Sequence, residues 1–257
     1  MSGLLLAFDT SGPIGSVAVG RDGATVGIRY LASQSRHASG LIPAVSSLLA
    51  EADSGPADLT GLIVGDGPGS FTGVRVAAAT AKGLAATLNL PVWAVSSLLA
   101  GAASGSVDLP AEVPLVTGDL ETHRSTGAAL EDSPFGYREP VLVVFDARGD
   151  RVYAAAYQWM HEGLVERIPP IATTVRELLE HPDLPGDAIC CGDGAVKHGG
   201  TLQDAGLTVE PPPVGLPTAE ALLRIHGLGV TGAPLDDVAS WEPTYLRGSS
   251  AKPLTGA

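Results

Sequence analysis

The sequence contains few cysteines, and this shortage excludes a disulfide-stabilised scaffold. Its 257 residues include two cysteines, Cys190 and Cys191, which are adjacent. Neighbouring side chains on a strand point to opposite faces, so these two thiols are not expected to bond to each other. They are expected instead to be small buried residues of a protein in a reducing compartment.

Basic residues are also scarce, with 15 Lys and Arg against 28 Asp and Glu and a formal net charge of −13. Such a surface repels phosphate backbones, and the sequence has no run of Lys and Arg that would form a local basic patch. Direct nucleic-acid binding is therefore not expected. Any role on RNA would act mainly through another protein.

Long apolar runs are absent as well, since no stretch approaches the roughly 20 residues of a membrane span. The first residues, Met1 to Leu4, have no basic region, and the apolar run that follows ends at Asp9, unlike a signal peptide. We expect a soluble, cytoplasmic protein with no membrane partner. With 45% hydrophobic residues, the chain has enough apolar side chains for one large domain or two small ones.

Two parts of the chain repeat the same pattern. Residues 4–12 read LLLAFDTSG and residues 141–149 read VLVVFDARG, so in each an apolar run ends in Phe-Asp and a Gly follows three positions after the Asp. A Gly-Asp-Gly follows each copy at a similar distance, 66 − 9 = 57 and 193 − 146 = 47 residues. The same order at similar spacing indicates an internal duplication.

Hydrophobic periodicity and turn residues predict three strands, a helix, a strand and a further helix in each half. The expected strands are 4–8, 16–19, 24–30, 62–64, 92–95, the apolar run that begins at Val141, 152–157, 164–168 and 188–191. The expected helices are 39–52, 71–88, 175–180 and 218–227. This plan resembles the actin, Hsp70 and sugar-kinase superfold, an α/β fold of two ribonuclease-H-like lobes that face a cleft.

The predicted domain division places an N-terminal actin-like lobe at residues 1–104 and a C-terminal lobe at 105–257. Residues 117–139 have few apolar side chains, which predicts an extended, mobile loop. The helix at 218–227 comes late in the chain, and we expect that it could pack back on the N-terminal lobe.

The stretch IVGDGPGSFTGVR, residues 63–75, looks like a phosphate-binding loop. Its glycines permit sharp turns, and the helix start that follows could attract an anion. A P-loop, however, requires Gly-Lys-Ser/Thr at the helix start, where this chain has Ser70-Phe71-Thr72-Gly73. A Walker-type NTPase is excluded.

The helices at 39–52 and 71–88 are apolar on more than one side. Either they are central helices covered by the sheet and the second lobe, or their Ala-rich sides dock a partner. The second interpretation predicts a set of partner-binding residues: Leu41, Val45, Leu48, Val74, Ala78, Ala81 and Ala85. It also predicts that Arg at Ala78 or Ala81 abolishes partner binding and leaves the fold unchanged.

The most specific motif is GDGPGSFTGVRVAAATAKGLA, residues 65–85, which resembles the signature of the TsaB (YeaZ) family. Similar family segments correspond to AFDTSG, RHASGLIP, VSSL, FDARGDRVYAAAY and PTYLR, so the resemblance covers nearly the whole chain. Members of this family are the dimerisation subunits of the bacterial complex that makes N6-threonylcarbamoyladenosine in tRNA.

The resemblance implies a non-catalytic subunit that binds and activates the TsaD-type adenosine-37 threonylcarbamoyltransferase. It also implies recruitment of a TsaE-type ATPase, only indirect contact with tRNA, and a homodimer when the transferase is absent. TsaD has a metal-binding His-x-x-x-His shortly after the equivalent helix. By count from the shared Gly-Pro-Gly, these positions are Ser97 and Gly101, so no metal and no catalytic residue are expected.

A vestigial nucleotide cleft remains a hypothesis, with these candidate residues: Asp9, Thr10, Ser11, Gly67, Gly69 and Asp146. No cofactor is required, although ATP or ADP could bind in the cleft or at a subunit interface. One alternative is an active ATPase or small-molecule kinase that holds a magnesium nucleotide with Asp9, Thr10, Ser11 and Asp146. A second alternative is a homodimeric binding protein outside any tRNA pathway.

Overall fold

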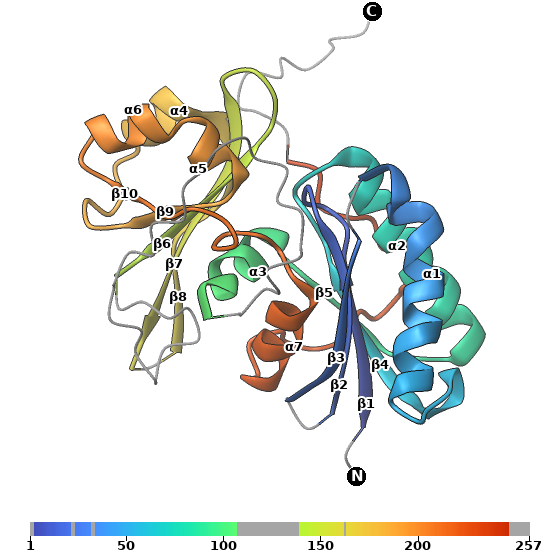
Figure 1. The fold of residues 1–257 in the computed structure, drawn as a ribbon. Helices are drawn as coiled ribbons and strands as arrows, with labels where there is room; N and C mark the ends of the chain where they lie inside the picture. Colours follow the sequence, from blue (N-terminus) through green and yellow to red (C-terminus); the bar gives the residue numbers. More distant parts are fainter. Residues whose placement is uncertain (1–2, 22–23, 32–33, 107–138, 162, 247–257) are drawn as a thin grey trace, which may run out of the picture.

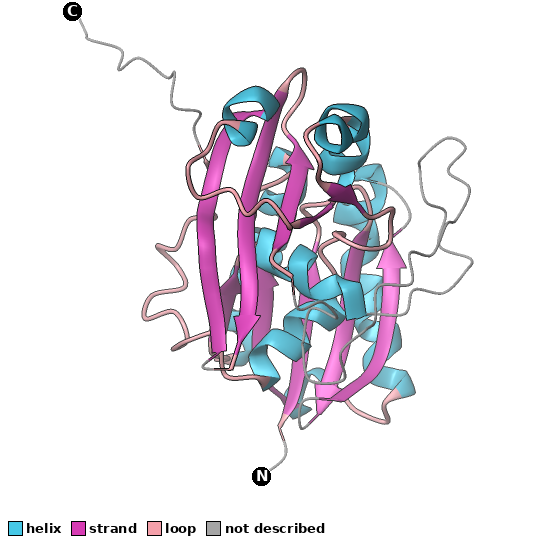
Figure 2. Cartoon of the chain, turned by 90° about the vertical axis from the view of Figure 1, so that its left-hand side faces the viewer, coloured by secondary structure: helices cyan, strands magenta, loops and turns pink. Residues whose placement is uncertain are grey.

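The computed structural model describes residues 3–21, 24–31, 34–106, 139–161 and 163–246. It contains two layers of strands with helices between them and on both outer sides (Figure 1). Figure 2, which is turned by 90°, shows one of these layers in front with helices behind it. The predicted loop at 117–139 lies outside the described residues, apart from Glu139.

The first sheet and its helices come from the first 106 residues. The strands are β1 (Leu4–Asp9), β2 (Gly15–Arg21), β3 (Ala24–Leu31), β4 (Leu59–Gly65) and β5 (Val92–Val95). The helices are α1 (Gln34–Glu51), α2 (Phe71–Leu88) and α3 (Ser97–Ala103), with short 3-10 turns at Pro56–Asp58 and Ser104–Ser106. The Ser70 side chain caps the start of α2, and Asn89 in the left-handed conformation ends it.

The second sheet belongs to the later part of the chain. Its strands are β6 (Val141–Asp146), β7 (Arg151–Met160), β8 (Gly163–Thr174), β9 (Ile189–Cys191) and β10 (Thr208–Val209). The helices are α4 (Val175–Leu179), α5 (Asp193–Lys197), α6 (Gly199–Asp204) and α7 (Ala219–Gly227). Cys190 and Cys191 of β9 are buried free thiols, and burial raises the pKa of Cys190 to about 12.

The two sheets have the same topology, in the orders β3-β2-β1-β4-β5 and β8-β7-β6-β9-β10. In each, the first strand pairs antiparallel with the second and parallel with the fourth. The last pair is parallel in both sheets. This repetition confirms the predicted duplication and the predicted class, an α/β fold of two ribonuclease-H-like lobes.

Each sheet is covered on both faces, because its central strands carry apolar side chains in both directions. In β1, Leu6 and Phe8 face the outer helices α1 and α2, while Ala7 faces the other side. In β6, Leu142 and Val144 face the outer helices of the second lobe, and the alternate residues face inward.

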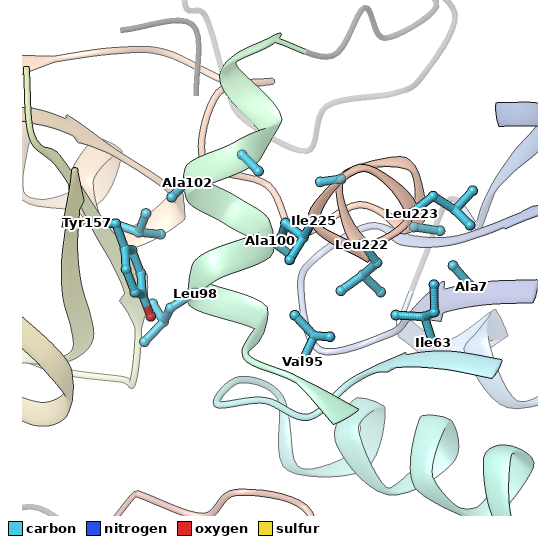
Figure 3. Packing of buried hydrophobic residues seen from close by; sticks show 14 of the residues in the cluster. Ala7, Ile63, Val95, Leu98, Ala100, Ala102, Tyr157, Leu222, Leu223 and Ile225 are labelled. Carbon is cyan, nitrogen blue, oxygen red and sulfur yellow. The ribbon is translucent and has the colours of Figure 1, made fainter. Parts of the chain in front are cut away.

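The inner core is built from helices that cross between the lobes. Helix α3 follows the first sheet but contacts β6 and β7 of the second, whereas α7 comes near the end of the chain and contacts β1, β2, β3 and β4. The two helices also contact each other. Figure 3 shows α3 between the strand of Tyr157 and α7: Leu98 points toward Tyr157, and Ala100 lies on the opposite side, next to Ile225 and Leu222 of α7. The lobes therefore share one core.

Several elements differ from the sequence expectations. Helix α1 begins at Gln34, five residues before the predicted start, and β8 continues to Thr174 through two prolines. Helix α3 was not predicted, because its seven residues are too short to show a helical period. The elements α5, α6 and β10 are shorter still and were also missed.

Candidate partner-binding surface and interlobe cleft

The glycine-rich loop fixes the start of α2 to the turn after β1. The hydroxyl of Thr10 donates to the carbonyl of Gly73 at 2.6 Å, and the amide of Ser70 donates to the carbonyl of Ser11 at 2.8 Å. A Cβ at Gly73 would overlap the Thr10 carbonyl oxygen, so only glycine allows this approach. The loop that resembles a phosphate cradle thus has a structural role at this contact.

Asp9 lies in a closed polar site beneath this loop. Its side chain has no exposed surface and accepts hydrogen bonds from the amide and hydroxyl of Ser11 and the hydroxyl of Ser97, each at 2.7 Å. The Ser97 oxygen also accepts a bond from the amide of Gly67 at 3.0 Å. Ser97 therefore joins Asp9 to the glycine-rich loop. Counted from the shared Gly-Pro-Gly, Ser97 is the position that corresponds to the first histidine of the TsaD motif.

A cleft of about 560 Å³ lies between the lobes. It is lined by Ser11, Gly12, Pro13, Gly69, Ser70, Phe71, Thr72, Phe145, Asp146, Ala147, Arg148, Tyr153 and Asp193. Three of the six predicted cleft residues, Ser11, Gly69 and Asp146, are among them.

The other three predicted cleft residues do not line the cleft, and the prediction was wrong for them. Asp9 and Thr10 have no exposed surface, because their side chains bond to Ser97, Ser11 and α2. Gly67, at a φ of 87°, packs near Val74 and the carbonyl of Thr244.

The carboxylates on the second side of the cleft already have partners. Oδ1 of Asp146 accepts a bond from Nζ of Lys197 at 2.7 Å and from the amide of Arg148 at 2.9 Å. Oδ1 of Asp193 accepts from the amides of Asp146 and Gly194 at 3.1 and 3.0 Å. Burial raises the pKa of Asp193 above its usual range.

The structure contradicts the predicted partner-binding face of the helices. All seven residues are 7% exposed or less, because they face the molecule's own core rather than solvent: Leu41, Val45, Leu48, Val74, Ala78, Ala81 and Ala85. The small Ala side chains let α2 approach its own sheet closely. Arg at Ala78 or Ala81 would therefore disturb the fold, contrary to the sequence-based expectation.

The outward sides of α1 and α2 form a different apolar surface. We define the outer α1–α2 face by exposed residues of the two adjacent helices: Ile42, Phe71, Ala79, Gly83 and Ala86. Ile42 and Phe71 are 47% and 57% exposed. A Cβ at Gly83 would meet nothing within 4 Å, so no contact with another described residue explains a glycine there. Glycine in a helix interior costs about 1 kcal/mol relative to Ala, and this was the signal that the sequence reasoning missed.

A segment near the end of the chain also contacts α2. In this C-terminal strap, residues 235–246, the amide of Leu235 donates to the carbonyl of Val92, and Nζ of Lys82 donates to the carbonyl of Ala239, both at 2.8 Å. The strap ends at Asp66, whose carboxylate accepts a bond from the Thr244 hydroxyl at 2.6 Å. It brings residues far apart in sequence to the start of α2.

Within the described part of the chain, no group of three or more His, Cys, Asp and Glu side chains could hold a metal ion. None of the helices described is both long and apolar enough to cross a membrane.

Comparison with known proteins shows similarity to proteins of tRNA threonylcarbamoyladenosine synthesis. Residues 25–123 match the family model of TsaD, the tRNA N6-adenosine threonylcarbamoyltransferase. The chain is 30% identical over 255 residues to the tRNA threonylcarbamoyladenosine biosynthesis protein TsaB of Escherichia coli, with 98% of each chain covered. It is 33% identical over 187 residues to the protein of the same name from Bacillus subtilis, which covers 70% of this chain and 68% of that one.

Among solved structures, the chain is similar to YeaZ from Pseudomonas aeruginosa, with 28% identity and a TM-score of 0.70 over 95% of this chain and all of that one. The two lobes of matching topology and their common core define a protein of the actin, Hsp70 and sugar-kinase superfold. Within that class, the chain belongs to the TsaB (YeaZ) family. The resemblance inferred from residues 65–85 is confirmed.

Proposed function

We propose that this chain is a non-catalytic subunit in the formation of threonylcarbamoyladenosine in tRNA. Through the outer α1–α2 face it binds a TsaD-type transferase and holds it in its active arrangement. The observation that carries this proposal is the uncovered Gly83, which lies between the exposed Ala79 and Ala86 on the same face. Small side chains on a helix let a partner's helix approach closely, and burial of the face would offset the cost of the glycine.

A non-catalytic role is supported by the carboxylates of Asp9 and Asp146, because both already have hydrogen-bond partners within the chain. Asp9 is enclosed by Ser11 and Ser97, and Asp146 is paired with Lys197, so neither carboxylate is free for a magnesium nucleotide. A side chain at Gly101, the second metal-ligand position by count, would meet the Gly215 carbonyl at 2.8 Å. The chain's packing thus opposes both nucleotide turnover and a metal clamp.

The remaining partners follow from this role. The complex recruits a TsaE-type ATPase, and any ATP or ADP binds in the cleft or at a subunit interface as a ligand that this chain does not hydrolyse. The chain contacts tRNA only indirectly, in agreement with its net charge of −13. Without the transferase, two copies associate through the same apolar face, because burying it is favourable.

The test compares Ala79→Arg with the matched control Ala205→Arg, which changes an exposed Ala at the end of α6 in the other lobe. Calorimetric titration with the cognate transferase should show a loss of about 100-fold or more for Ala79→Arg, since a charged side chain would be buried in the interface. The control should bind like the unmodified chain. Both variants should melt at the unmodified temperature.

Equal affinity of Ala79→Arg and the control would refute docking through this face. Cells that depend on Ala79→Arg should also lose threonylcarbamoyladenosine from their tRNA, and an unchanged level after depletion of the chain would exclude the pathway. Steady ATP hydrolysis by the isolated chain, abolished by Asp146→Asn, would instead support the kinase or ATPase alternative.

A further inference from the structure

The two Gly-Asp-Gly turns of the duplicated fold use their aspartates differently. Asp193 accepts bonds from the amides of Asp146 and Gly194, within its own lobe. Asp66 instead accepts the hydroxyl of Thr244 at 2.6 Å and its amide at 3.2 Å, and its carbonyl also accepts that amide at 2.9 Å. Thr244 lies 178 residues later in the chain. Only the aspartate of the first turn thus holds the C-terminal strap among the described residues.

This contact places the next residue, Tyr245, against the start of α2. The Tyr245 ring lies 5.7 Å from the ring of Phe71, and its oxygen accepts a bond from Nε of Arg75 at 3.2 Å. The Arg75 guanidinium lies over the Phe71 ring, 3.8 Å from its centre. We name these three residues the Phe71–Arg75–Tyr245 cluster.

The cluster is exposed although two of its members are aromatic. Phe71 and Tyr245 are 57% and 43% exposed, and Phe71 is also part of the outer α1–α2 face, so the two surfaces are continuous. Within the described residues, Tyr245 is the acceptor that the Arg75 guanidinium reaches, through Nε alone. The two terminal nitrogens of the Arg75 guanidinium form a planar fork that matches a carboxylate.

A single carboxylate in an otherwise apolar protein surface is the ligand that fits this chemistry. Aromatic residues and Arg are enriched among the residues that dominate binding energy at protein interfaces. RNA also offers anions and stacking bases, but the net charge of −13 opposes its approach. The continuity with the apolar helix face therefore favours a protein partner.

We propose that the Phe71–Arg75–Tyr245 cluster anchors the outer α1–α2 face by binding an Asp or Glu side chain of the transferase. The Asp66–Thr244 pair is the positioning element, because it fixes Tyr245, which in turn orients Arg75. This inference rests on the proposed function, since it names the group that the partner presents to the same surface.

The experiment measures calorimetric affinity for the cognate transferase at two salt concentrations. Arg75→Gln should bind about 30-fold more weakly, as expected for an interface anchor, and should lose part of the salt dependence. Arg176→Gln is the matched control, because this exposed Arg on α4 pairs with Glu180 one helical turn later. It should bind like the unmodified chain.

The positioning role is tested with variants of Tyr245 and Thr244. Tyr245→Phe keeps the ring but removes the acceptor for Arg75, and should weaken binding about 5-fold. Thr244→Val should have a similar effect, whereas Thr244→Ser keeps the hydroxyl and should restore affinity. Combined with Tyr245→Ala, Thr244→Val should cause no further loss, because the pair acts through Tyr245.

The outcomes separate the two proposals. If the unmodified chain does not bind the transferase, the proposed function itself fails. If it binds and Arg75→Gln binds equally well, the anchor is refuted while the docking function stands. If Arg75→Gln leaves transferase affinity unchanged and lowers tRNA retention by the complex, the cluster contacts RNA and this proposal is overturned. Unchanged binding by Thr244→Val would refute the positioning role.

Discussion

The closed site around Asp9 makes a quantitative prediction for Ser97→Ala. The Ser97 hydroxyl donates to Oδ2 of Asp9 at 2.7 Å and accepts from the amide of Gly67 at 3.0 Å, and both bonds are buried. Loss of a bond to a carboxylate costs about 1.5–3 kcal/mol, and a buried amide left without an acceptor costs about 1–3 kcal/mol. Alanine regains about 0.5 kcal/mol of helix propensity in α3. The expected loss of unfolding free energy is therefore about 2–5 kcal/mol.

Urea unfolding, followed by circular dichroism and tryptophan fluorescence, measures this loss. A destabilisation of about 3 kcal/mol should lower the melting temperature of a chain of this size by about 6–12 °C. Ser46→Ala is the control, because Ser46 is exposed on α1, and it should stay within about 0.5 kcal/mol of the unmodified chain. If Ser97→Ala matches that control, the two bonds do not stabilise the fold and the reasoning about the closed site is wrong.

Two further predictions concern the metal-ligand positions and Asp66. The double variant Ser97→His, Gly101→His should be less stable and should not bind a metal ion. The reason is that a Cβ at residue 101 would lie 2.8 Å from the Gly215 carbonyl and 3.2 Å from the Phe145 ring. A folded variant that carries one equivalent of zinc or iron by mass spectrometry would contradict this. Burial raises the pKa of Asp66 above its usual 3.8, so ionising it costs folding free energy as pH rises through the raised pKa. The unfolding free energy of Asp66→Asn relative to the unmodified chain should therefore increase from acidic to neutral pH, and a pH-independent difference would disprove this assignment.

The fold could be predicted from the sequence because its signals are local and occur twice. The Phe-Asp-x-x-Gly and Gly-Asp-Gly repeats predicted the duplication, and apolar runs located most of the strands. Helix α2 was predicted with its exact bounds, since the Ser70 cap and the terminating Asn89 are both visible in the sequence. Helix α3 lacked such signals, because seven small and apolar residues show no clear period.

The candidate site was harder to predict, because apolar composition does not say which side of a helix is covered. Ala78 and Ala79 are neighbours of the same type, yet Ala78 is buried and Ala79 is exposed. The helices of the outer α1–α2 face were therefore predicted correctly. The residues predicted to bind a partner, however, lie on the buried sides of these helices. Asp9 was likewise predicted as a cleft residue, although Ser97, 88 residues later, encloses it.

The sequence by itself determined the class of fold, the family and the lack of a histidine pair at residues 97 and 101, because these depend on residue types at fixed spacing. The tertiary structure alone decided which residues meet. It placed α3 on the second sheet and α7 on the first, and it joined Asp66 to Thr244. Such contacts between distant residues depend on the packing of the whole chain, which no local pattern records.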